Sequence, residues 1–300
     1  MVKFLEMRNP HPPMLNADLP LLKQLSLNSE PYHDPLARLN WGELNLHDYW
    51  LPPAALSLAG LPAFESQDEQ IKRRLSQYEF VNFIQAGLWL EGLFVERLSK
   101  SLKHIESLTE YAYRLHEIRE EVGHSLMFVK LMEKSGLHLP TNCFQRPWLP
   151  DFLGRHAPLH SRLFWLAVVI GEEVPDRLNR YVRANCDAVN PLVKQMCTLH
   201  IIDEARHLAH ARGELDRSLE RAAPFARKLL SPWARTLITQ LVRAFYLPRA
   251  EVYELAGLTP GRQWRSLASH NPGRLEFVAQ NLRPTLNLLT GHGLVVAPRP

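Results

Sequence analysis

The chain has 300 residues, of which 46% are hydrophobic and 22% charged. A chain of this length and composition can bury a large core, and we expect one domain over residues 1–300. The formal net charge of +4 comes without a long run of lysine or arginine, so nothing indicates a nucleic-acid or membrane partner. No apolar stretch approaches the roughly 20 residues of a membrane span. The three cysteines lack a CxxC spacing, and we expect a cytoplasmic protein.

The chain divides into three parts by residue pattern. Residues 1–75 are rich in proline, asparagine and tryptophan and show no sustained period, which predicts an ordered wrap with short helices. Over about residues 76–221, apolar residues recur at helical spacing. This pattern predicts four long helices, at Tyr78–Lys103, Thr109–Ser135, Ser161–Arg183 and Pro191–Arg221.

Residues at the ends of these patterns predict where the helices begin and end. Thr109 and Asn190 are predicted N-caps, and Gly136 is a predicted C-terminal cap. The segment from Leu137 to His160 contains four prolines and predicts a crossover that runs the length of a bundle.

The third part, residues 222–300, is expected to form C-terminal helices and a tail. Helices are predicted at Ser231–Tyr246 and at Arg274–Leu289. In the first of these, Ser231 and Pro232 provide the cap signal of an N-cap followed by proline.

Two predicted helices carry a Glu-x-x-His pattern, Glu121 to His124 and Glu204 to His207. Residues three apart share a helix face, so a carboxylate and an imidazole in this arrangement can reach one metal. Two such helices, each with a partner helix that supplies one more glutamate, form the two-metal site of a ferritin-like bundle. The sequence therefore predicts an all-α, ferritin-like four-helix bundle with additional N- and C-terminal helices.

The two remaining helices each offer two candidates for the missing glutamate. On the first helix, Glu91 lies in the middle of the apolar stripe, whereas Glu96 lies beside polar residues. On the third helix, the apolar stripe continues to Glu173, which is favoured over Glu172. A buried, unpaired carboxylate is costly, and a metal is one of few partners that offset this cost. Pro175 predicts a bend or bulge in this helix.

The fourth helix adds a further histidine to the set. His200, Glu204 and His207 lie four and three residues apart and form one stripe. His210 continues this face one turn further on and is interpreted as a packing residue. Asp203 lies beside the stripe, as does Arg206, and both are expected to orient the imidazoles through outer hydrogen bonds. The candidate metal ligands are therefore Glu91, Glu121, His124, Glu173, His200, Glu204 and His207.

This pattern resembles the ferritin-like diiron N-oxygenases typified by p-aminobenzoate N-oxygenase. The resemblance includes the early Tyr-His-Asp-Pro-Leu and Tyr-Trp-Leu-Pro-Pro segments and the ligand helices, and its most specific mark is His200 ahead of the last Glu-x-x-His. It implies a homodimer with two iron ions per chain, one held by Glu91, Glu121 and His124, the other by Glu173, His200 and His207. Glu121 and Glu204 would bridge them.

The same resemblance implies an activity and its partners. Dioxygen would serve as co-substrate, and a primary amine, free or carrier-bound, would be oxidised to a hydroxylamine, nitroso or nitro product in secondary metabolism. Electrons would come from an external reductase or ferredoxin-like donor.

Three alternatives stay open at the level of sequence. They are a carbon-oxidising enzyme of the same fold, a manganese-containing oxidase, and a non-catalytic iron-binding bundle. Three arginines are candidates to anchor a substrate carboxylate, namely Arg177, Arg180 and Arg206.

Overall fold

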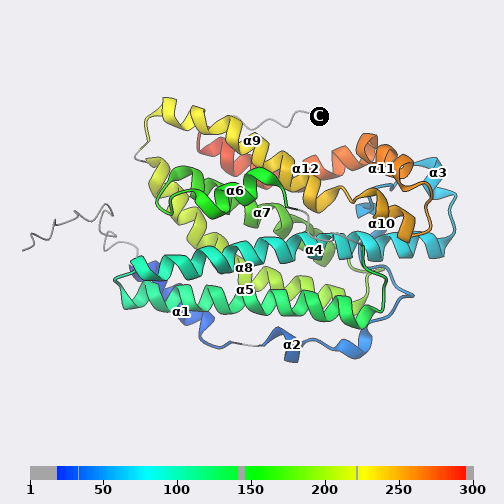
Figure 1. The fold of residues 1–300 in the computed structure, drawn as a ribbon, viewed down its shortest axis with the longest axis horizontal. Coiled ribbons are helices and arrows are strands. Elements are labelled where there is room, and N and C mark those ends of the chain that lie inside the picture. Colours follow the sequence, from blue (N-terminus) through cyan, green and yellow to red (C-terminus); the bar gives the residue numbers. More distant parts are fainter. Residues whose placement is uncertain (1–18, 33, 141–145, 221, 295–300) are drawn as a thin grey trace, which may run out of the picture.

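The computed structural model describes residues 19–32, 34–140, 146–220 and 222–294 (Figure 1). Over these ranges the chain is helical and contains no β-strand, and one isolated parallel bridge joins Tyr49 to Val189. The predicted all-α, ferritin-like class is confirmed. Several parts of the predictions lie outside the described residues: the first eighteen residues of the wrap, the part of the crossover that contains Cys143, Arg221 at the end of the fourth helix, and the last six residues.

The N-terminal segment forms the expected short helices before the first long one. They are α1 (Leu19–Ser29), α2 (Pro35–Arg38), two 3-10 turns (Trp41–Glu43 and Pro53–Ala55) and α3 (Pro62–Glu65). Trp50 is fully buried, and its indole N–H donates to the carbonyl of Asn45. The backbone N–H of Asn190 donates to the carbonyl of Tyr49, so this segment is attached to the start of the fourth bundle helix.

Four long helices form the bundle, namely α4 (Glu69–Ser101), α5 (Leu108–Ser135), α7 (Arg162–Ala184) and α8 (Pro191–Glu220). Helix α4 begins nine residues before the predicted Tyr78, because its polar first turns carry no apolar stripe that the sequence pattern could detect. Helix α7 stays α-helical through Pro175, so the proline does not end it.

Local capping explains where two of these helices start or stop. The N-cap of α5 is Ser107, whose hydroxyl accepts from the N–H of Glu110, and not the predicted Thr109. Gly136 ends α5 with a φ of 62°, a left-handed conformation that glycine adopts without strain, as predicted. The side chain of Asn190 accepts from the N–H of Leu192 at the start of α8, also as predicted.

The bundle helices are antiparallel neighbours, with α4 packed on α5 and α7 packed on α8. Helices α5 and α7 therefore run in the same direction, and their connection has to return along the bundle (Figure 1). This return contains helix α6 (Trp148–His156), which packs on α4, α7 and α9. The predicted crossover is confirmed for the part of it that the structure describes.

The C-terminal part adds α9 (Pro224–Tyr246), α10 (Ala250–Leu255), α11 (Gly261–His270) and α12 (Pro272–Gly291). The predicted start of α9 at Ser231 is wrong, because Pro224 takes the first helical position and Pro232 lies inside the helix. Helix α12 begins and ends within two residues of its prediction and packs on α7. It thereby becomes part of the wall behind the third bundle helix.

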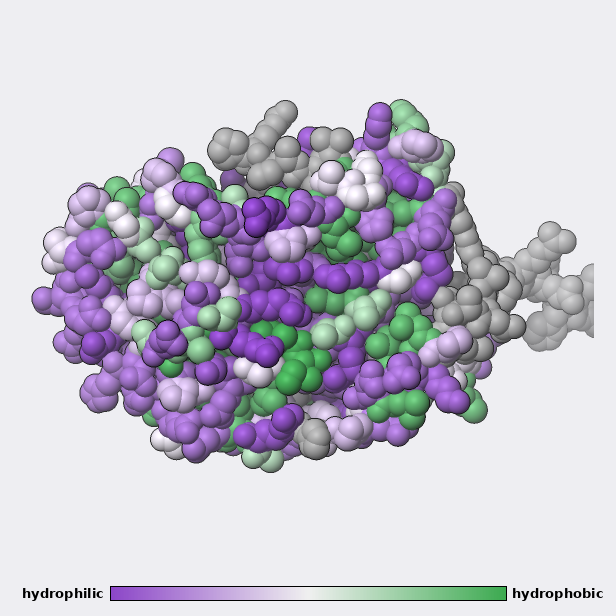
Figure 2. Space-filling view, turned by 180° about the vertical axis from the view of Figure 1, so that it is seen from behind, coloured by the Kyte–Doolittle hydropathy of each residue, from purple (hydrophilic) through white to green (hydrophobic). Residues whose placement is uncertain are grey.

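On the face opposite to that of Figure 1, hydrophilic side chains predominate, and apolar side chains gather near the middle (Figure 2). Among the described residues, no helix combines the length and the apolar character that crossing a bilayer requires.

Candidate metal centre

The interior of the bundle brings together six of the seven predicted ligands. Glu91 comes from α4, Glu121 and His124 come from α5, and α8 supplies the remaining three. Each of the six residues is at most 5% exposed: Glu91, Glu121, His124, His200, Glu204 and His207. Residues that the sequence separates by more than 100 positions thus meet in one buried cluster.

Donor atoms in this cluster fall into two groups. In the first, Nε2 of His200 lies 3.1 Å from Oε1 of Glu91, and Nδ1 of His124 lies 3.4 Å from Oε1 of Glu204. In the second, Nδ1 of His207 lies 3.0 Å from Glu121 and 3.4 Å from Oε2 of Glu204. Glu204 belongs to both groups, with one oxygen directed at each. This is the arrangement expected of a carboxylate that bridges two metal positions.

The grouping differs from the one that the resemblance implied for His200 and for Glu121, which lies with Glu204 and His207 and not with Glu91 and His124. His200 lies with Glu91 and His124, with its ring centre 4.3 Å from that of His124, and not with His207. The ring of Phe128 stacks on the other side of His200 at 5.6 Å.

The seventh predicted ligand, Glu173, lies outside the cluster. Its carboxylate accepts hydrogen bonds from Arg177 and Arg212 and, at 2.8 Å, from the hydroxyl of Thr285. The neighbouring Glu172 lies near Glu204 and Glu121, and its pKa is raised first by burial and then by the charges of these two carboxylates. These surroundings favour Glu172 over the predicted Glu173 as a candidate ligand. Both are buried, since α7 packs against α4, α6, α8, α9 and α12, so an apolar stripe could not distinguish them.

The alternatives on the other helices take different places. Glu96, which was rejected in favour of Glu91, pairs with Lys100 and Arg155 near the surface. His210 lies one turn beyond the cluster, 3.3 Å from Glu117, in a buried network with Arg114. It is thus a packed, partnered residue, as predicted.

Six oxygen and nitrogen atoms of the cluster that could bind a metal have no hydrogen-bond partner among the described residues. They are Oε2 of Glu91, Oε2 of Glu121, Nδ1 of His124, both carboxylate oxygens of Glu204, and Nδ1 of His207. Buried polar atoms without a partner are rare and costly in proteins. Carboxylate oxygens and imidazole nitrogens are donors that suit divalent iron or manganese. The residues therefore fit a pair of metal ions.

The electrostatics of the cluster support the same reading. Burial raises the pKa of Glu91 to about 8. Burial, followed by the charge of a neighbouring carboxylate, also raises the pKa of Glu121 and of Glu172 well above the usual range. Burial opposes the charge of Glu204, but His207 and His200 lower its pKa overall. Without a metal, the cluster thus retains protons that bound cations would displace.

Each histidine presents one nitrogen to the cluster and the other to an outer partner. Nε2 of His124 lies 3.2 Å from Asp203, Nε2 of His207 lies 3.0 Å from Glu120, and Nδ1 of His200 lies 3.1 Å from the side-chain amide of Asn179. Arg206 donates to both outer carboxylates. Such outer bonds fix the orientation of a ligating imidazole.

Sequence reasoning identified Asp203 and Arg206 but missed Glu120 and Asn179. A signal for Asn179 exists in the sequence, because Glu172, Asp176 and Asn179 lie four and three residues apart and form a polar stripe along α7. That stripe also marks Glu172.

The arginines proposed as substrate anchors are all engaged in ion pairs. Arg177 pairs with Glu173, Arg180 with Asp176, and Arg206 with Glu120 and Asp203. These ion pairs indicate that the three arginines are parts of the scaffold.

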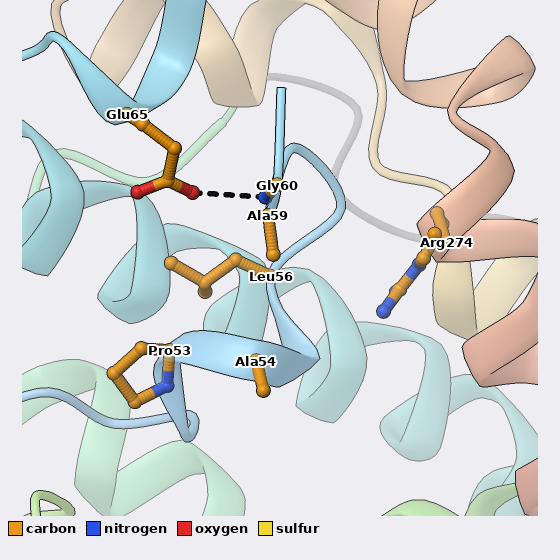
Figure 3. Close-up of a pocket in the computed structure, with 8 residues that line it drawn as sticks. Pro53, Ala54, Leu56, Ala59, Gly60, Glu65 and Arg274 are labelled. Atoms are coloured by element: carbon orange, nitrogen blue, oxygen red, sulfur yellow. Dashed lines mark hydrogen bonds between the residues drawn. The ribbon is translucent and has the colours of Figure 1, made fainter. Parts of the chain in front are cut away.

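A pocket of about 360 Å³ lies away from the cluster, lined by Pro53, Leu56, Gly60, Glu65 and Arg274 among others (Figure 3). The pocket adjoins Ser57, whose backbone N–H donates to Glu79 on α4. Glu79 is twelve residues from Glu91 on the same helix, a distance of about 18 Å along the helix axis. The guanidinium of Arg274 donates to the carbonyls of Ala55 and Tyr246. The pocket is thus remote from the metal-binding atoms of the cluster, and the guanidinium of Arg274 already donates its hydrogen bonds to the backbone.

A helical bundle in which α4, α5 and α8 bring carboxylates and imidazoles into two adjoining groups is typical of a ferritin-like protein with a candidate two-metal centre. Residues 21–293 match the family model described as p-aminobenzoate N-oxygenase AurF. The chain belongs to this family of diiron enzymes.

Two curated relatives are similar to most of the chain. They are the uncharacterized protein Mb0909 of Mycobacterium bovis and the uncharacterized protein Rv0885 of Mycobacterium tuberculosis, each 24% identical over 206 residues, or 68% of this chain. The matched segment spans 61% of the length of each relative.

Proposed function

We propose that this protein is a non-haem diiron oxygenase that uses dioxygen to oxidise a primary amine to a hydroxylamine, nitroso or nitro product. The observation that carries the proposal is the cluster of buried carboxylates and imidazoles with unpartnered donor atoms. Membership in the p-aminobenzoate N-oxygenase family supports nitrogen as the atom oxidised.

Seven residues would hold the two irons. Glu91, His124 and His200 would hold one, Glu121, Glu172 and His207 the other, and Glu204 would bridge. When bound, the irons would supply the oxygen chemistry. We propose that they are reduced by an external reductase or ferredoxin-like partner in the cytoplasm.

The protein's own part is orientation and exclusion of water. Asp203, Glu120 and Asn179 hold the three imidazoles in place through their outer nitrogens. Mainly apolar side chains of α4, α6 and α7, among them Leu90 and Phe94, line a narrow cavity of about 20 Å³, which has room for about one water molecule.

The test begins with protein loaded with ferrous iron without oxygen. Oxygen is then admitted while visible absorption is followed, and aryl and alkyl amines are offered in separate reactions. We expect a transient absorption band and, by mass spectrometry with labelled dioxygen, an amine that has gained labelled oxygen on nitrogen. The Glu204→Ala variant is the matched control and should show neither.

Each alternative gives a different result in the same experiment. Label on carbon would indicate a carbon-oxidising enzyme, and iron bound without oxygen uptake would indicate an iron-binding bundle. Activity restored only by manganese would indicate a different metal. Any of these outcomes would overturn the proposal of amine oxidation by a diiron centre.

A further inference from the structure

Helices α6 and α9 carry large apolar side chains that are exposed to solvent. Five residues, each between 43% and 72% exposed, form what we call the apolar patch: Trp148, Phe152, Phe225, Leu229 and Trp233. Trp148 and Phe152 lie four residues apart and therefore share one face of α6. Single exposed apolar residues are common, but a group of this kind marks an interaction surface.

The register of α9 connects its part of the apolar patch with α6. The backbone N–H of Leu149, the residue after Trp148, donates to the side chain of Gln240 on α9 at 3.0 Å. Trp233 lies seven residues and Leu229 eleven residues before Gln240, so all three point to the same side of α9 within about 20°. Figure 1 shows the two helices next to each other. The apolar patch is thus one continuous surface.

Helix α9 surrounds its part of the apolar patch with positive charge. Its 23 residues include no aspartate or glutamate, and they contain four cations, Arg227, Lys228, Arg235 and Arg243. Among the described residues, no carboxylate forms a salt bridge with any of these four side chains. Lys228 and Arg243 are exposed. The cations are spread along the helix, so no run of basic residues marks this surface in the sequence.

A second group of exposed apolar side chains, on α5, has different neighbours. Leu115 and Leu126 are 48% and 49% exposed there, but α5 contains five glutamates beside four lysines or arginines. Glutamates are repelled by a negatively charged surface, whereas α9 offers it attraction alone. Charge therefore distinguishes the two surfaces.

From this combination we infer that the apolar patch attaches the protein to the surface of an anionic membrane. Tryptophan and phenylalanine with lysine or arginine beside them are what interfacial helices present to lipid. Phe225 and Trp148 are the most exposed of the five, at 72% and 68%. Such protruding rings enter the headgroup region without the preformed pocket that a protein partner would have to supply. The cations of α9 would bind the lipid phosphates.

The first experiment measures how the full chain sediments with lipid vesicles. We expect it to bind vesicles of phosphatidylcholine mixed with phosphatidylglycerol at least about tenfold more tightly than vesicles of phosphatidylcholine alone, and added salt should weaken the binding. The Trp148→Ser/Phe225→Ser variant should bind about tenfold more weakly or less. Leu115→Ser/Leu126→Ser is the matched control on α5 and should bind as the parent does. Circular dichroism checks that each variant is folded.

A second experiment separates the contribution of charge from that of insertion. Lys228→Glu/Arg243→Glu should weaken binding to the anionic vesicles on the order of 25-fold or more, since each cation near such a surface contributes about fivefold. Trp148→Phe/Trp233→Phe keeps both rings and should still sediment with the vesicles. Lipids with brominated acyl chains should quench tryptophan fluorescence in the parent and much less in this variant.

Three results would overturn the inference. Protein that stays in solution with both kinds of vesicle would do so and would favour an acidic protein as the partner of the patch. Binding that ignores lipid charge and salt would also contradict it, as would loss of binding in the α5 control. These measurements need neither iron nor oxygen, so they stand or fall separately from the proposed oxygenase function.

Discussion

Two neighbouring carboxylates on α7 lie in opposite kinds of surroundings. Glu173 has two arginines and a threonine around it, which together satisfy its charge. Glu172, one residue earlier, lies near Glu204 and Glu121, and burial followed by the charges of these two residues raises its pKa. Both side chains are buried, yet only one of them has partners that neutralise it.

The difference shows how to separate a structural carboxylate from one that is available to a metal. A buried carboxylate paired with arginine links helices, here α7, α8 and α12. A buried carboxylate among other carboxylates and imidazoles has no stable charge balance until a cation binds. Burial alone does not make this distinction, and the identity of the partners does.

The strongest test of this distinction between Glu172 and Glu173 replaces each carboxylate in turn. Glu172→Gln should weaken iron binding at one position by on the order of 100-fold or more, more than the loss of an outer partner usually costs. Glu173→Gln should retain both irons but lower the free energy of unfolding by about 2–3 kcal/mol, since it leaves Arg177 unpaired and Arg212, which is partly exposed, without its partner. Iron titration and urea unfolding of the metal-free protein measure the two effects, and the opposite pattern would contradict the account.

A second pair compares histidines on α8. His200→Ala should weaken one metal position by about 100-fold, because His200 lies against Glu91 within the cluster. His210→Ala should leave both positions occupied, since His210 bonds to Glu117 and Arg114 instead. Iron-to-protein ratios after desalting provide the measurement. Equal loss in both variants would show that the two residues have been wrongly distinguished.

The outer partners should have a smaller effect. Glu120→Gln removes the charge that holds Nε2 of His207, and we expect iron affinity to fall by about 10- to 100-fold. Glu117→Gln is the matched control on the same helix, one turn away from the cluster, and should change affinity much less. If both variants bind iron as the parent does, the orienting role of Glu120 is wrong.

The smallest effect concerns pH. The raised pKa of Glu91, about 8, means that the folded, metal-free protein holds a proton that the unfolded chain has lost. Its stability should therefore fall as pH rises from about 5 toward 8. Iron-loaded protein should show no such fall, because the metal displaces the proton. Thermal unfolding at a series of pH values compares the two forms, and parallel curves would contradict the assignment of Glu91 to the metal centre.

The sequence was sufficient for the parts of this picture that rest on periodicity. Two Glu-x-x-His pairs and His200 predicted the helices and the buried faces of α5 and α8, and the structure brings those residues together. The sequence pattern failed on α7, where residues on most sides of the helix are buried and burial cannot distinguish one side from another. Helix α7 is covered on several sides, so buried residues lie around most of its circumference, and the apolar stripe alone led to Glu173. The polar stripe Glu172, Asp176, Asn179 was the better guide.

Sequence patterns could not identify ion-pair and hydrogen-bond partners that come from distant segments of the chain. Nothing near Glu173 in the sequence indicates that Arg212 on α8 and Thr285 on α12 would neutralise it. The same holds for Glu120 on α5, which contacts His207 on α8. Three-dimensional packing decides which carboxylates remain without a counter-charge.

Anomalous diffraction from crystals soaked in ferrous iron without oxygen tests the central claim most directly. The account predicts two peaks on either side of Glu204, one beside Glu91, His124 and His200, and one beside Glu121, Glu172 and His207. A peak beside Glu173, or no peak within the cluster, would contradict it.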